Sequence, residues 1–169
     1  ADFAMPSALS DDLSSLWNFS LAVYARAGVA DACLRLQDEH DANVNLLLWC
    51  AWLGAKGYSL EQEQLLQAQR VIASWDENYV KPLRALRRKM KSEFGVGDAN
   101  IESVRNSIKQ AELHAERQLQ FWLEQVITDG EKSCVDTGKI MRANILLYLS
   151  CIGAADNAHA KNLLDALDS

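Results

Sequence analysis

A polar stretch from Gln37 to Asn45 holds the residues best suited to bind a ligand. Asp38 and Asp41, with Asn45 beyond them, could present oxygen atoms to a hard cation such as Mg²⁺, which would suit metal-assisted handling of a phosphate. Aspartate and asparagine are also standard helix caps, and no second acidic motif is apparent to complete a coordination sphere. Helix capping is therefore the simpler interpretation of these residues, and a binding site is the alternative.

A second candidate is the basic segment 81–91, which holds six of the seventeen lysines and arginines. If its helix buries Leu83, Leu86 and Met90, the basic side chains should point largely away from the core. Such a stripe could contact phosphates or an acidic partner, or it could pair with acidic residues of neighbouring helices. The candidate binding residues in this segment are Arg84, Arg87, Arg88 and Lys91.

Motifs for common catalytic and metal sites are incomplete. The segment that contains Glu112 and His114 misses by one position the Glu-x-x-His spacing of di-iron bundles. Gly138-Lys139 lacks the earlier glycine and the following serine or threonine of a phosphate-binding loop. We therefore predict no catalytic residue, no metal ion and no cofactor, although a cysteine–histidine pair brought together by the fold stays open.

Composition fits a globular protein of one domain. The 169 residues are 49% hydrophobic and 24% charged, and no apolar run approaches the roughly 20 residues needed to cross a bilayer. The net charge of −6 argues against nucleic-acid binding by the whole surface. Four cysteines without a Cys-x-x-Cys pair, and no basic-then-apolar leader, lead us to expect a reduced cytoplasmic protein that does not contact membranes.

Two ten-residue segments, 45–54 and 144–153, are alike: each starts with asparagine, ends with glycine and is almost wholly apolar between. A segment that is apolar on every side, with a helix starter and a helix stopper, predicts a helix buried all round. No segment alternates as a strand would. We therefore predict an all-α, single-domain bundle of six or seven helices around these two buried central helices.

Caps, glycines and apolar spacing indicate where the helices lie. A capping box at Ser59 and Gln62 starts the longest one, which Pro82 should kink or break near residues 79–81. The two longest helices, separated by a short loop, should form an antiparallel hairpin. The predicted helices cover about residues 11–27, 29–38, 44–53, 60–94, 100–127, 139–151 and 157–167, and residues 131–138 are ambiguous.

The domain is expected to span residues 10–169, with Ser10 capping its first helix. Residues 1–9 are expected to be a disordered N-terminus, in which residues 1–4 are vector-derived and Met5 is the natural start.

Several motifs together resemble a family of small, uncharacterised, all-helical proteobacterial proteins that carry a domain of unknown function. They are Leu16-Trp17-x-Phe19-Ser20-Leu21, Gly28-Val29-x-x-Ala32-Cys33-Leu34, Val44-Asn45-Leu46-Leu47-Leu48, Pro82-Leu83-Arg84-x-Leu86-Arg87 and Asn144-x-Leu146-Leu147-Tyr148. The resemblance spans about residues 13–155 and implies a helical cytoplasmic protein without an established activity. The family pattern includes Gln37, Asp38, Asn45, Trp75, Pro82 and Arg84, but the resemblance assigns them no role.

Two functions are consistent with these features. The first is a non-enzymatic interaction module that binds an acidic protein, or less strongly a nucleic acid, through the basic helix face. The alternative is a Mg²⁺-dependent or phosphate-ligand-binding enzyme with a pocket near Asp38, Asp41 and Asn45. The oligomeric state stays open.

Overall fold

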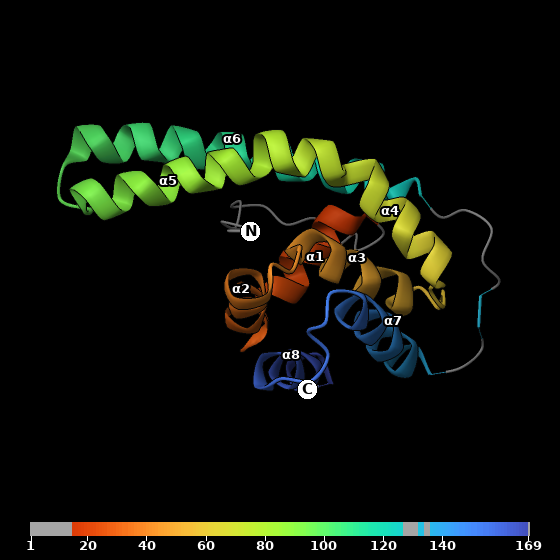
Figure 1. Ribbon diagram of the computed structural model, residues 1–169. Helices are drawn as coiled ribbons and strands as arrows, with labels where there is room; N and C mark the ends of the chain where they lie inside the picture. Colours follow the sequence, from red (N-terminus) through yellow and green to blue (C-terminus); the bar gives the residue numbers. More distant parts are fainter. Residues whose placement is uncertain (1–14, 127–131, 134–135, 169) are drawn as a thin grey trace.

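The computed structural model describes residues 15–126, 132–133 and 136–168, and this part of the chain forms helices joined by turns, without a β-strand (Figure 1). The fold class is all-α, as predicted. If α4, η1 and α5 are taken as one bent rod, the described residues hold seven helical segments. The elements are α1 (Leu16–Tyr24), α2 (Val29–His40), α3 (Val44–Ala55), α4 (Gln62–Trp75), η1 (Asp76–Val80), α5 (Lys81–Phe94), α6 (Ala99–Glu124), α7 (Thr137–Cys151) and α8 (Ala158–Asp168).

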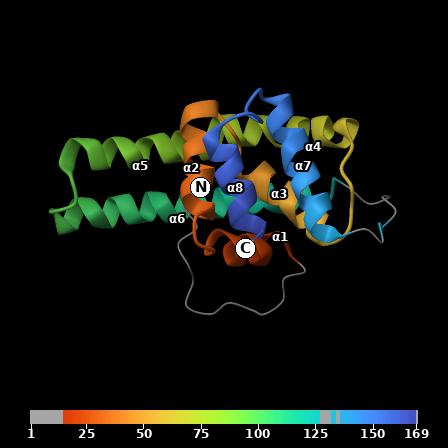
Figure 2. The same cartoon turned by 90° about the horizontal axis from the view of Figure 1, so that it is seen from below.

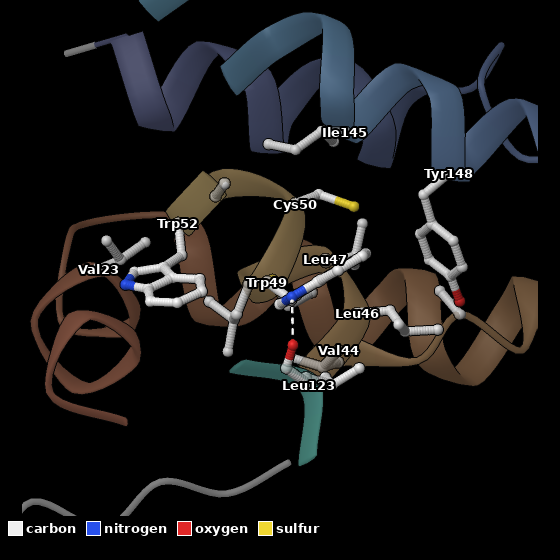
Figure 3. Close-up of a cluster of buried hydrophobic side chains, with 14 of the residues drawn as sticks. Val23, Val44, Leu46, Leu47, Trp49, Cys50, Trp52, Leu123, Ile145 and Tyr148 are labelled. Carbon is white, nitrogen blue, oxygen red and sulfur yellow. Dashed lines mark hydrogen bonds between the residues drawn. The ribbon is translucent and has the colours of Figure 1, made fainter. Parts of the chain in front are cut away.

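Helix α3 is the centre of the fold, because eleven of its twelve residues are buried. It contacts α1, α2, α6 and α7. At its middle Trp49 is fully buried, and its indole N–H donates to the carbonyl of Leu123 at 2.9 Å (Figure 3). A buried indole N–H needs such a partner, so this bond fixes the rotation of α3 relative to α6.

The second apolar segment differs from the prediction. Helix α7 packs closely on α3, but it lies outside α3 and leaves Ser150 and Cys151 exposed, so the expectation of burial on all sides was wrong for this segment (Figures 1 and 2). Helix α7 begins at Thr137, close to the predicted start at residue 139, and Asn144 lies in its middle. The buried side-chain amide of Asn144 donates to the carbonyls of Cys50 and Tyr58 and accepts from the amide of Leu60.

Helices α5 and α6 form the predicted antiparallel hairpin, which extends beyond the other helices in both views (Figures 1 and 2). A kink or break was expected near residues 79–81, and the helical hydrogen bonds between α4 and α5 do change their spacing there. The five residues of η1 form a π-helix, and the amide of Lys81 donates to the carbonyl of Asp76, five residues earlier. This change places Pro82, which has no N–H to donate, in the first turn of α5.

Helix boundaries differ from the prediction by a few residues. The capping box of α4 uses Glu61 and Gln64 instead of Ser59 and Gln62, and α1 begins after Ser15, whose hydroxyl accepts from the amide of Asn18 at 3.1 Å. The expected leader, the Ser10 cap and part of the ambiguous segment 131–138 lie outside the described residues. No helix in the described part of the chain is long and apolar enough to span a bilayer.

Gly54 provides a direct test of the packing between α3 and α7. A Cβ atom at this position would lie 2.3 Å from the Cα atom of Met141, and both backbones would have to separate. We therefore expect Gly54→Ala to lower the free energy of unfolding by about 2–3 kcal/mol, measured by urea denaturation. Gly97→Ala is the control, because nothing lies within 4 Å of its Cβ position. Equal urea midpoints for the two variants would contradict this packing.

Candidate functional site

A small cleft lies where the α2–α3 turn meets η1 and the start of α5. Its volume is about 50 Å³, and one water needs about 10–15 Å³, so it has room for a few water molecules or one small chemical group. It is lined by Gln37, Asp41, Ala42, Asn43, Asp76, Lys81 and Arg84. Three of the residues singled out from the sequence, Gln37, Asp41 and Arg84, therefore meet here.

The α2–α3 turn forms one wall of the cleft through two helix caps. Asp41 ends α2 in the left-handed backbone region, with a φ of 54°, and is the only non-glycine residue of the described chain with positive φ. The Asn43 side chain caps α3 by accepting from the amides of Asn45 and Leu46, and its own amide donates to the Tyr148 hydroxyl at 2.7 Å. Capping therefore accounts for Asn43, while the carboxylate of Asp41 stays exposed.

The opposite wall begins at Asp76, the first residue of the π-helix. Its residue surface is only 9% exposed, and its carboxylate makes no hydrogen bond and no direct ion pair with any other described residue. Burial raises the pKa of Asp76, and the more distant positive charges of Lys81 and Arg84 only partly offset this. The cleft thus contains a carboxylate that the surrounding protein does not neutralise at short range.

An aromatic cluster holds this wall against α6. The Trp75 indole N–H donates to the carbonyl of Ala115 at 2.9 Å, and its ring meets that of Trp122 edge-on at 5.2 Å between centroids. The ring of Tyr79 lies 4.7 Å from Trp75 on the same side. Trp75 therefore anchors η1 on α6 and holds the neighbouring Asp76 in place.

Two of the basic candidates on α5 do not point away from the protein, as expected, but pair with buried carboxylates of α6. Arg87 makes a bidentate contact with Glu112, at 2.6 and 3.2 Å, and the side chains are 12% and 1% exposed. Arg84 lies 3.6 Å from Glu112 and 3.5 Å from Glu116. The expectation failed because α6 packs against this side of α5 and presents two carboxylates one turn apart.

The other candidate residues named from the sequence do not line the cleft. Arg88 is 45% exposed and pairs with Asp38 at 2.9 Å, and Lys91 is exposed farther along α5. Asn45 lies in the core, where it accepts from the side-chain amide of Gln120 at 3.0 Å, so it does not line the cleft. Asp76 was not predicted from the sequence, because no local signal shows that an aspartate beside Trp75 becomes buried.

The far part of the α5–α6 hairpin, residues 86–109, forms a projecting arm (Figure 1). It contains six basic and three acidic residues, which gives a net charge of +3 and leaves −9 on the rest of the chain. Lys89 is 70% exposed and Lys91 is exposed beside it. The arm also exposes four large apolar side chains, those of Leu86, Phe94, Val96 and Val104.

No group of three or more histidine, cysteine, aspartate or glutamate side chains in the described residues could hold a metal ion.

The raised pKa of Asp76 predicts an unusual dependence of stability on pH. Between the ordinary aspartate value of 3.8 and the raised value, the folded protein binds more protons than the unfolded one, so the free energy of unfolding falls as pH rises. We expect Asp76→Asn to stabilise the protein at about pH 7 and to have almost no effect at about pH 4. Thermal melts across this range measure the difference.

Asp31→Asn is the matched control, because the Asp31 side chain is 80% exposed. An Asp76→Asn protein that melts no higher than the wild type at neutral pH would show that ionised Asp76 carries no penalty.

Comparison with known proteins supports a family but no activity. A family model with the description "Protein of unknown function (DUF2390)" matches residues 15–123, more than half of the chain. No curated protein and no solved structure matches. The matched region includes the cleft and the arm, whereas α7 and α8 lie beyond it. The chain therefore belongs to the DUF2390 family of proteins of unknown function.

Proposed function

We propose that the chain is a non-enzymatic interaction module whose arm binds an acidic protein partner. The observation that carries this proposal is the combination of cations and exposed apolar side chains on a hairpin that extends beyond the other helices. A helix pair that leaves four large apolar side chains in water loses the stabilisation that their burial would give. A partner protein that covers these side chains would restore the stabilisation that their burial provides.

Charge supports an acidic partner. The exposed cations Arg88, Lys89 and Lys91 lie within about one turn of α5, and the arm is positive although the chain as a whole is negative. Opposite charge on a partner would speed its association with the arm and orient it there, and salt would weaken both effects.

The apolar side chains favour a protein over a nucleic acid. Leu86 is 47% exposed and Phe94 at the end of α5 is 55% exposed, and an acidic amphipathic helix would cover such residues with its own apolar face. A phosphate backbone would leave them in water. In addition, the net charge of −9 on the remainder of the chain would repel a long nucleic acid.

An enzyme that handles nucleotides or phosphates is less well supported. A volume of about 50 Å³ is too small for a nucleotide, and Asp41 and Asp76 would repel a phosphate group in the cleft.

The location that fits this proposal is the bacterial cytoplasm, which keeps thiols reduced. Cys33 and Cys50 are free thiols in the core, and burial raises the pKa of Cys33 to about 12, so both are poor nucleophiles.

Reversing two exposed positive charges of the arm tests the proposal. Lys89→Glu combined with Lys91→Glu should reduce capture of an acidic protein from the native cell by at least about tenfold, since like charges would then meet at the interface. Mass spectrometry of the captured proteins and nucleic acids, with and without nuclease, measures the result. Arg84 is unsuitable for this test, because its variants would remove a partner of the buried Glu116 and so affect the fold itself.

The control is Lys139→Glu combined with Lys161→Glu, which changes the net charge equally at exposed positions on α7 and α8. If both double variants retain the same acidic partner, the arm is not its binding surface. If nuclease removes the captured material, the partner is a nucleic acid and the protein interaction is refuted.

A further inference from the structure

Three uncommon structural features meet at the cleft. One wall is the π-helix Asp76–Val80, and π-helical turns within α-helices occur frequently at functional sites. The other wall carries Asp41 with a φ of 54°, a conformation that aspartate adopts more readily than most residues but that still has an energetic cost. The third feature is Asp76, a residue with only 9% of its surface exposed, whose carboxylate opens on the cleft and has no hydrogen-bond partner in the described chain. Their coincidence indicates a ligand site.

The local charges leave this carboxylate without a counter-ion. Lys81 is already engaged by Glu77 at 3.0 Å and lies 3.7 Å from Asp41, and Arg84 is engaged by the two glutamates of α6. Counting the charged residues that line the cleft with their ion-pair partners gives two more carboxylates than basic groups. They are Asp41, Asp76, Glu77, Glu112 and Glu116 against Lys81, Arg84 and Arg87. The ligand that fits this excess is a cation.

The shape and the donor set restrict the kind of cation. The cleft holds only a few non-hydrogen atoms. A divalent metal prefers more oxygen ligands than Asp41 and Asp76 supply. A primary ammonium group needs only three acceptors for its three N–H bonds, and two carboxylates with one amide or water oxygen provide them.

We propose that this cleft binds the primary ammonium group of an organic amine, with the carboxylates of Asp76 and Asp41 as its acceptors. The carbon chain of the amine extends outward, because the cleft has no room for it. The amine is either a free small molecule, such as an aliphatic diamine, or a lysine side chain of another protein, since both carry the same terminal group.

Titration of the full chain with 1,4-diaminobutane and, separately, with an Nα-acetylated lysine amide tests the proposal. We expect saturable changes in amide NMR signals of residues 37–43 and 76–84, together with a higher melting temperature. Binding of the diamine alone assigns the site to a free amine, and binding of the lysine amide alone assigns it to a protein lysine. Binding of both supports the ammonium as the shared recognition element.

Two variants make the test specific. Asp76→Asn keeps the shape of the side chain, and Asp41→Asn keeps a residue type that tolerates positive φ, so both should fold. Each should weaken amine binding by about tenfold or more, because each removes a charged hydrogen-bond acceptor. Asp31→Asn, at an exposed position of α2, should leave the affinity unchanged.

Several results would overturn the proposal. It fails if neither amine produces a saturable change, and it fails if the wild type and Asp76→Asn bind the amines with equal affinity. Tetramethylammonium has no N–H donor. If it changes the NMR signals as much as the amines do at matched ionic strength, the changes come from non-specific charge screening and not from hydrogen bonds to an ammonium group. Displacement of the amine by millimolar Mg²⁺ in preference to K⁺ would identify a metal site instead. These outcomes do not depend on the arm, which lies on a different part of α5 and α6.

Discussion

The ion pairs between α5 and α6 hold the two helices together and decide which basic residues of α5 remain exposed. Arg87 and Glu112 form a bidentate pair with almost no exposed surface, and Arg84 lies between Glu112 and Glu116. Desolvation makes such charges costly unless each keeps its partner, so the pairs hold the two helices in one register. The same pairs divide the basic segment into an inner part buried against α6 and an outer part that is exposed to solvent. Burial also raises the pKa of Glu116, an effect that the adjacent Glu112 reinforces.

The arm and the cleft lie on opposite sides of this junction along α5. Toward the tip, Arg88, Lys89 and Lys91 remain accessible beside exposed apolar side chains. Toward the core, the π-helix turns Asp76 into a cleft where no described residue neutralises it directly. Because Arg84 reaches both Glu116 and the cleft, the electrostatics of the cleft depend on the pairs that hold the arm.

Sequence periodicity was sufficient for the helices but not for the environment of their charges. The burial of α3 follows from its almost wholly apolar sequence, and the hairpin follows from the short glycine-rich loop between two long helices. The register change before Pro82 follows from the missing N–H of proline. The like run in α7 misled us, because an apolar helix at the outside of the core looks the same in sequence as one at its centre. The pairing of Arg84 and Arg87 depended on which side of α5 meets α6, and the environment of Asp76 depended on how η1 packs beside the α2–α3 turn. No spacing within one helix specifies these contacts.

The most direct test of this account is a double-mutant cycle for Arg87→Met and Glu112→Gln, with the free energy of unfolding measured for all four proteins. If the pair fixes α5 on α6, each single variant loses stability and the coupling energy reaches about 1–3 kcal/mol, as for buried partners in contact. Losses that add within about 0.5 kcal/mol would show that Arg87 is not held by Glu112, and the division of the basic segment into inner and outer parts would be wrong.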